Sequence, residues 1–201
     1  MKTISEETTE NILKAARKEF LEYGFSEASL RRISSASDVS THTIYTRFGD
    51  KEGLFDALVK KTADDLFAIY QDSVNRSHTS DYHDSYEQGE EGSHAMLKYI
   101  YQHFDDVKLI ISRSKGCKYE HYLDRFVEVE EKSYEFFLQN IPNLKKKVNG
   151  YFFHVLSKRS FSSFNEIVDN NMSYEEAKDY LETMIEFDLG GLNRVLGIKE
   201  D

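Results

Sequence analysis

The chain has 201 residues, a formal net charge of −10, one cysteine and one proline. A single cysteine excludes an internal disulfide framework, and no apolar run approaches the roughly 18 to 20 residues of a membrane-spanning helix. The first ten residues lack the apolar core of a secretion signal, so we expect a cytoplasmic protein without a membrane segment.

Apolar residues recur at helical spacing along almost the whole chain, and no long alternating strand pattern is visible. This pattern predicts an all-α fold with an N-terminal domain at residues 1–50 and a larger helical domain at residues 51–201. Residues 77–92 are polar, acidic and punctuated by glycine, so we expect a flexible connection there. About nine helices are expected, at residues 9–23, 30–36, 41–47, 51–75, 93–104, 105–114, 118–140, 144–169 and 174–196.

Residues 28–51 are the most informative segment of the chain. The first short helix carries an apolar face, Ser37-Asp38 supplies turn chemistry, and Ser40 stands where the N-cap of a second helix belongs. The outer face of that second helix is polar, with Thr41, His42, Thr43, Thr46 and Arg47. A short helix that is apolar on one side and carries hydrogen-bonding groups on the other suits a DNA major groove.

The negative charge of the chain is unevenly distributed. Residues 1–51 contain eight basic and eight acidic residues, so residues 52–201 carry the entire net charge of −10. The acidic part repels DNA. Binding to DNA therefore requires a local cationic face in the N-terminal part, and weak non-specific affinity is expected.

Residues 9–55 resemble the TetR family of bacterial transcriptional regulators. The first helix ends in Tyr23-Gly24-Phe25, and the helix-turn-helix contains Val39-Ser40 and closes on Tyr45-Thr46-Arg47-Phe48-Gly49-Asp50-Lys51. Two positions depart from the family pattern, because Asp38 and His42 stand where glycine is common. Asp38 tolerates a left-handed backbone, and His42 adds a side chain on the expected DNA-facing surface, which bears on the operator sequence.

The resemblance implies a transcriptional regulator, specifically a repressor released from a palindromic operator by a small-molecule effector, with no enzymatic activity. Thr41, His42 and Thr43 correspond to positions that face base edges or adjacent phosphates. The expected phosphate contacts are Tyr45, Arg47, Lys51, Arg31 and Arg32. The partners implied are double-stranded DNA, a second copy of the chain in a homodimer, and an unidentified effector.

The resemblance also implies an effector pocket in the C-terminal domain and a dimer surface on the last two helices. An aromatic lining would suit a planar or amphipathic apolar ligand, or a cation if the rings form a cage. The pocket candidates are Tyr99, His103, Phe104, Ile111, Tyr119, Tyr122, Phe126, Phe152 and His154, although an aromatic stripe at helical spacing is also typical of a core. The interface candidates are Phe161, Phe164, Ile167, Val168, Tyr180, Met184, Phe187, Gly190 and Gly191.

Two alternatives remain open at this point. The aromatic C-terminal region is compatible with a helical small-molecule-binding enzyme, although no catalytic constellation is visible. A protein partner could replace the small effector, with the acidic stretch at residues 81–91 as its contact surface. No metal-ligand spacing or phosphate-binding loop is present, so we assign no metal and no cofactor. Cys117 lies near two lysines, which would favour a reactive thiolate.

Overall fold

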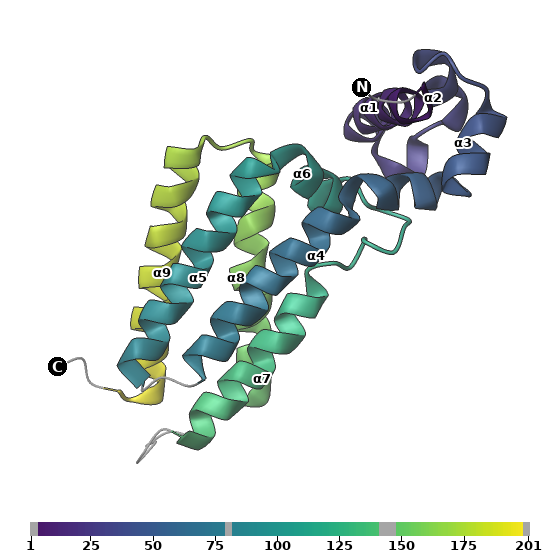
Figure 1. Ribbon diagram of the computed structural model, residues 1–201. Coiled ribbons are helices and arrows are strands. Elements are labelled where there is room, and N and C mark those ends of the chain that lie inside the picture. The colour runs from purple at the N-terminus through teal and green to yellow at the C-terminus, as the bar shows by residue number, and fades with distance from the viewer. Residues whose placement is uncertain (1–3, 79–81, 141–147, 199–201) are drawn as a thin grey trace. The chain divides into compact units, whose positions relative to one another are not determined.

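The computed structural model describes residues 4–78, 82–140 and 148–198 (Figure 1). Within these residues the chain is all-helical, which confirms the predicted fold class. Two compact units are present: the first contains residues up to 64 together with 103–122, and the second contains 65–102 together with the residues from 123 onward. The helices are α1 (Ile4–Glu27), α2 (Leu30–Ala36), α3 (Thr41–Phe48), α4 (Lys51–Ser77), α5 (Tyr82–Gln102), α6 (Phe104–Ser112), α7 (Asp124–Asn140), α8 (Gly150–Asp169) and α9 (Tyr174–Leu196).

The first unit is built around an aromatic core. The ring of Phe55 on α4 makes edge contacts with Phe20 and Phe25, at centroid distances of 5.0 and 5.4 Å. Ile33 of α2 and Ile44 of α3 are fully buried, so each of the two short helices is anchored by one large apolar side chain of its own. α6 joins the same unit through its contact with α1.

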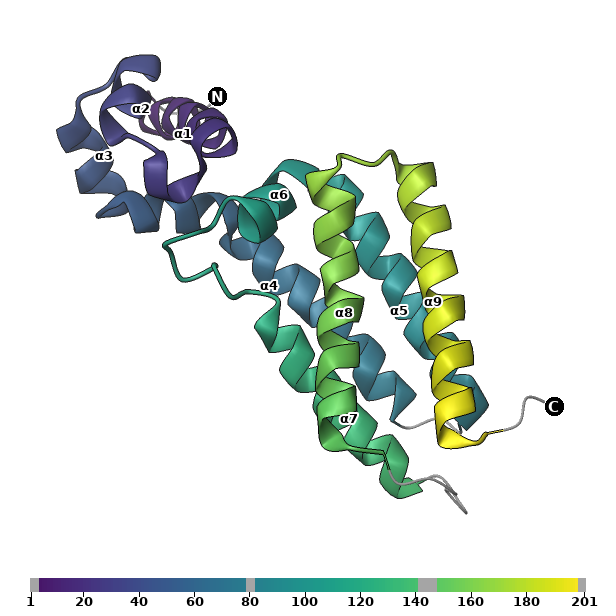
Figure 2. The same cartoon turned by 180° about the vertical axis from the view of Figure 1, so that it is seen from behind.

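The second unit contains the C-terminal part of α4 with α5, α7, α8 and α9. Figures 1 and 2 both show α5 beside α9 and α7 beside α8. Phe126 of α7 is fully buried and packs on Phe67 and Tyr70 of α4, at 5.0 and 5.1 Å between ring centroids. The hydroxyl of Tyr101 on α5 donates to the Met172 carbonyl at 2.6 Å, which ties α5 to the turn between α8 and α9.

The predicted helix starts at residues 41, 51 and 174 are confirmed, and each has a capping side chain. The Ser40 side chain accepts from the Thr43 amide at 3.1 Å, and the Asp50 carboxylate accepts from the Gly53 amide at 2.7 Å. Ser173 and Glu176 form the reciprocal capping box at the start of α9. These side chains satisfy amides that have no partner within their own helix.

The prediction of a flexible connection at residues 77–92 is wrong for its described part. α5 begins at Tyr82, whereas the helix was expected to begin at residue 93. The glycines have another reason: a Cβ on Gly92 would lie 1.9 Å from the Ser73 Oγ on α4. Gly92 therefore permits close helix packing. The acidic stretch proposed as a partner-binding loop is helical from residue 82 onward.

Three other helix boundaries differ from the prediction. α1 begins at Ile4, whereas the first helix was expected to begin at residue 9. It is interrupted at Gly24, where φ is +73°. α7 begins only at Asp124, because residues 113–123 form successive turns around Gly116, which has a φ of +89°. α8 begins at Gly150 with an Asn149 cap, while Pro142 and residues 144–147 lie outside the described residues.

Two glycines of α5 give a matched test of this packing. Gly92→Ala is expected to lower the free energy of unfolding by roughly 1–3 kcal/mol, because the new methyl group overlaps Ser73. Gly89→Ala meets nothing within 4 Å and should instead stabilise the protein by about 0.5–1 kcal/mol, because alanine loses less backbone freedom in a helix. Chemical denaturation followed by circular dichroism measures both, and equal effects would contradict the close approach of α4 and α5.

Candidate functional site

The α2–turn–α3 segment forms a helix-turn-helix with a tightly bonded turn. Asp38 adopts a left-handed backbone with φ of +54°, as expected for an aspartate in place of a turn glycine. The Ser34 hydroxyl donates to the Val39 carbonyl at 2.5 Å, and the Val39 amide donates to the Ser34 carbonyl at 3.2 Å. These paired bonds fix the direction in which α3 leaves the turn.

The two sides of α3 differ sharply in exposure. Ile44 is fully buried, whereas His42, Tyr45, Thr46 and Arg47 are exposed, Tyr45 by 51%. Thr41 and Thr43 are half-buried, and the Thr43 hydroxyl shares a 3.0 Å hydrogen bond with Ser40. The outward side of α3 therefore presents imidazole, hydroxyl and guanidinium groups, the kinds of side chain that contact base edges and phosphates.

A buried carboxylate on α1 holds the start of α2. Glu19 is 7% exposed, and its Oε1 accepts from the Ser29 amide at 2.8 Å and from the Arg32 Nε at 2.7 Å. Arg32 also donates to the Glu27 carbonyl at 2.8 Å and lies 4.3 Å from the centre of the Tyr23 ring. Ser29 makes no side-chain cap of its own, so Glu19 supplies the missing acceptor from a neighbouring helix.

The structure separates the predicted phosphate contacts into two groups. The Lys51 Nζ donates to the Ser26 carbonyl at 3.0 Å and the Ala28 carbonyl at 3.3 Å, and Arg47 donates to the Thr9 Oγ1 at 2.7 Å. Together with Arg32, these cations brace the helices around α3. Arg31 is exposed on α2 and Tyr45 on α3, which leaves both available to an approaching backbone.

The first unit also ties α1 to α6 and the segment after it. Arg17 of α1 pairs with the Asp106 carboxylate of α6, which also accepts from the Thr62 hydroxyl at 3.1 Å. The Phe25 amide donates to the Arg113 carbonyl at 2.8 Å. α1, against which α2 packs, is therefore bonded directly to α6 within one compact unit.

The second unit encloses a cavity of about 260 Å³. Small residues of α4 and α5 form one part of its wall, including Ser73, Ser77, Gly89 and Gly92. Aromatic and aliphatic residues of α7, α8 and α9 form the rest, including Tyr134, Phe137, Phe153, Phe161, Phe164, Leu181, Met184 and Leu192. The small residues on α4 and α5, opposite large residues on the facing helices, are the sequence feature that could have indicated this site. Two of these small residues, Gly89 and Gly92, lie in the stretch that was expected to be a flexible connection.

The aromatic residues predicted to line a pocket lie away from this cavity. The Tyr119 hydroxyl donates to Asp56 at 2.5 Å and the Tyr122 hydroxyl to the Ala63 carbonyl at 2.7 Å, both within the first unit. Tyr99 donates to Asp65 at 2.8 Å, and His154 pairs with Glu131. The other five predicted residues are His103, Phe104 and Ile111 in or next to α6, the buried Phe126, and Phe152, which packs beside Phe153. None of the nine residues lines the cavity.

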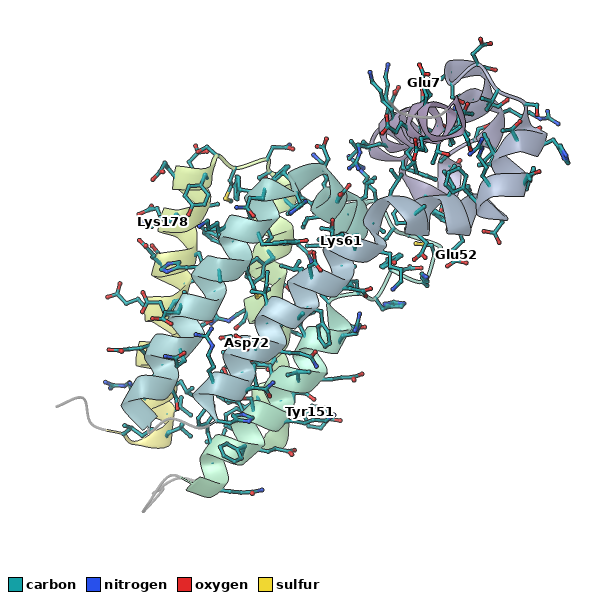
Figure 3. All side chains as sticks on the ribbon, in the orientation of Figure 1. Glu7, Glu52, Lys61, Asp72, Tyr151 and Lys178 are labelled. Atoms are coloured by element: carbon teal, nitrogen blue, oxygen red, sulfur yellow. The ribbon has the colours of Figure 1, made fainter. Side chains whose placement is uncertain are left out.

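The residues predicted for the dimer surface divide in the same way. Phe161, Phe164, Ile167 and Val168 are buried within the protomer, and Met184 lines the cavity. Tyr180 is half-buried, whereas Phe187 is 65% exposed and Gly190 and Gly191 are exposed. Tyr151 (Figure 3) and Val155 on α8 are the exposed apolar residues that the list omitted, at 79% and 61%.

No helix among the described residues combines the length and apolarity needed to cross a membrane, and those residues contain no group of three or more potential metal ligands. Burial raises the pKa of the Cys117 thiol, and the carboxylates of Glu52 and Glu120 act in the same direction. This opposes the reactive thiolate that the neighbouring lysines suggested.

The N-terminal region matches known proteins. Residues 12–58 match the family described as bacterial regulatory proteins, tetR family. The helix-turn-helix region of this chain is therefore similar to that of the TetR family. The HTH-type transcriptional regulator UidR of Escherichia coli K12 is 33% identical over 82 residues, which cover 41% of this chain and 42% of UidR. The HTH-type transcriptional repressor AcnR of Corynebacterium glutamicum is 43% identical over 54 residues, which cover 27% of this chain and 29% of AcnR.

The TetR-family likeness extends over the whole fold at low sequence identity. NalD, described as the secondary repressor of the MexAB-OprM multidrug efflux pump in Pseudomonas aeruginosa, has a TM-score of 0.60 with 18% identity, covering 92% of this chain and 96% of NalD. PfmR of Thermus thermophilus has a TM-score of 0.61 with 19% identity, covering 87% of this chain and 97% of PfmR. The chain spans less than half the length of the curated relatives it matches in sequence.

The buried carboxylate of α1 yields a prediction for the stability of the helix-turn-helix. Glu19→Ala leaves the Ser29 amide and the Arg32 guanidinium without their acceptor, so we expect a loss of roughly 1–3 kcal/mol in unfolding free energy. Glu7→Ala, on the exposed part of the same helix (Figure 3), should cost only a few tenths of a kcal/mol. Denaturant titration of both variants measures the difference, and equal losses would contradict the capping role of Glu19.

Proposed function

We propose that this chain is a homodimeric transcriptional repressor that binds operator DNA through α3 and is released when a small molecule enters the cavity of the second unit. The observation that carries the proposal is α3 itself, whose apolar side is buried through Ile44 while its imidazole and hydroxyl groups face outward. Such a helix at the end of a bonded turn is the reading element of helix-turn-helix proteins. AcnR and NalD are both described as repressors, which supports the direction of regulation.

Each exposed group has a role in this proposal. His42 and the threonines beside it read base edges, whereas Tyr45 and Arg31 contact phosphates. Lys51, Arg47 and Arg32 act mainly by holding the helices in position, because their cationic groups already bind the chain's own carbonyl, hydroxyl or carboxylate oxygens. An enzymatic activity forms no part of the proposal.

One helix connects the two functions. α4 begins with Lys51, which braces the helix-turn-helix, and ends with Ser73, Val74 and Ser77, which line the cavity. α4 is one continuous helix, so we propose that ligand binding at its C-terminal part is transmitted along it to the helix-turn-helix. By linkage, ligand and DNA weaken each other's binding, typically by about 1–3 kcal/mol.

A stripe of exposed residues on α8 and α9, which includes the apolar Tyr151, Val155 and Phe187, supports the homodimer. Tyr151, Val155 and Arg159 follow one another at four-residue spacing on α8, and the Arg159 guanidinium lies 5.0 Å from the centre of the exposed Phe187 ring on α9. Gly190 and Gly191 follow on α9, and a Cβ at either would meet nothing within 4 Å. We propose that a second copy of the chain covers this stripe, so that two α3 helices read two half-sites.

Selection from random duplexes tests the function directly. We expect a two-fold symmetric sequence with half-sites about one helical turn apart, and His42→Ala should change the preferred bases. The proposal fails if the purified protein is monomeric and shows no preference among duplexes at low ionic strength.

Two substitutions separate a charged phosphate contact from an uncharged one. Arg31→Ala should weaken binding to all sequences and reduce the slope of log K against log salt by about 1, whereas Tyr45→Phe should weaken binding without changing that slope, because no charge is removed. Fluorescence anisotropy at several salt concentrations measures both. Lys98→Ala, which removes an exposed cation from α5, is the control and should leave the slope unchanged. A changed sequence preference without loss of affinity would contradict these roles.

The stripe on α8 and α9 predicts the effect of a charge on assembly. Phe187→Asp should convert the dimer to a monomer in sedimentation experiments, because a desolvated carboxylate in an apolar contact costs several kcal/mol. Ala95→Asp introduces the same charge at an exposed position of α5 and should leave the dimer intact. Dissociation by both variants, or by neither, would argue against this surface.

A further inference from the structure

The charged groups lining the cavity are all acidic. Glu90, Glu130 and Asp188 contribute carboxyl groups to its wall, and the described lining residues include no lysine, arginine or histidine. A ligand that enters this cavity therefore meets negative or neutral polar groups. This distribution disfavours an anionic ligand, since its charge would be desolvated beside carboxylates without compensation.

Glu130 is the acid whose surroundings are most unusual. It accepts hydrogen bonds from the hydroxyls of Tyr70 and Tyr134, and all three side chains line the cavity. Burial raises the pKa of the Glu130 carboxyl, while the two tyrosine hydrogen bonds act in the opposite direction. The residue nevertheless keeps an intermediate exposure, so part of its surface faces the space inside the bundle.

The neighbouring acid Asp188 has its own cation. It pairs with Arg159 of α8 and accepts from the Ser160 hydroxyl at 3.2 Å. Glu130 has two neutral hydroxyl donors instead, and a carboxylate has about four acceptor positions. Glu130 can therefore accept a further charged donor, and a buried carboxylate gains most from a partner of opposite charge.

Aromatic rings surround the same space. Tyr70 and Tyr134 lie beside Glu130, and four phenylalanines complete the lining: Phe137, Phe153, Phe161 and Phe164. The face of an aromatic ring carries partial negative charge and attracts cations, most strongly where water is excluded. A carboxylate and ring faces together are complementary to a positive charge on an apolar body.

We propose that this cavity binds a hydrophobic organic cation, with its positive charge against the Glu130 carboxylate and its apolar part among the tyrosine and phenylalanine rings. This inference rests on the proposed function only in that it treats the cavity as the effector site. It names the chemical class of the effector, which the similarity to the TetR family leaves open.

Three ligands of related shape test the charge requirement in calorimetric titrations of the full-length protein. Benzyltrimethylammonium is the cation, neopentylbenzene is its neutral counterpart in which carbon replaces nitrogen, and 3-phenylpropionate is an anion. We expect the cation to bind at least about tenfold more tightly than the neutral compound, and the anion not to bind. Equal affinity for the cation and the neutral compound overturns the proposal, as does absence of binding by the cation.

Two variants on α7 locate the charge. Glu130→Gln should weaken binding of benzyltrimethylammonium by at least about tenfold while leaving neopentylbenzene unchanged. Glu128→Gln removes the same charge from an exposed position on the same helix and should have no effect on either compound. Unchanged cation affinity in folded Glu130→Gln overturns the proposal. If that variant does not fold, the comparison of the three ligands on the native protein still decides.

Separate measurements distinguish failure of this inference from failure of the proposed function. Cation binding is measured without DNA, and operator binding is measured without ligand. A protein that binds a symmetric duplex but prefers the neutral compound remains a repressor with an effector of another class. A protein that binds the cation through Glu130 but no duplex keeps the inferred site and loses the regulatory function.

Discussion

The position of the helix-turn-helix depends on one buried carboxylate of the first unit. Glu19 of α1 supplies the acceptor that α2 lacks at its start, and it pairs with Arg32 one turn further along. α2 has only seven residues, too few to be stable alone, so its position depends on this contact and on Ile33 in the core. The position of α2 in turn determines the positions of the turn and of α3, because both begin where α2 ends.

Several basic side chains of the N-terminal region also hold its helices together. Lys51 bonds to the carbonyls of Ser26 and Ala28, and it lies 4.7 Å from the centre of the Phe25 ring. These contacts join the start of α4 to the end of α1. Basic residues that the helix-turn-helix motif associates with phosphate binding therefore also help to position α3. The exposed groups on α2 and α3 supply the complementary surface for DNA, as the proposed function requires.

The cavity exists because small residues face large ones. Gly92 brings α5 close to Ser73 of α4, while Phe137 and Phe164 approach from other helices. Phe126 and Phe161 pack tightly against Tyr70 nearby, so the cavity has a rigid aromatic wall. Glu130 and Asp188 lie in this wall with different partners, hydroxyls for one and a guanidinium for the other. That difference gives the cavity one acid suited to an incoming cation.

The sequence by itself determined the features that depend on local interactions. The bounds of α2, the starts of α3, α4 and α9, and the polar outer face of α3 follow from caps and from helical periodicity within a few residues. The family pattern of the helix-turn-helix is local in the same sense, which is why residues 28–51 were so informative.

Only the tertiary structure decided which aromatic residues line the cavity and which glycines are helical. Tyr119 and Tyr122 are held in turns by acceptors on α4, about sixty positions away in sequence, and Gly92 leaves the space that Ser73 of α4 occupies. The same holds for Lys51, whose acceptors lie on a segment earlier in the chain. Periodicity shows that one side of a helix is apolar, but it does not show which helix will pack there or where space will remain.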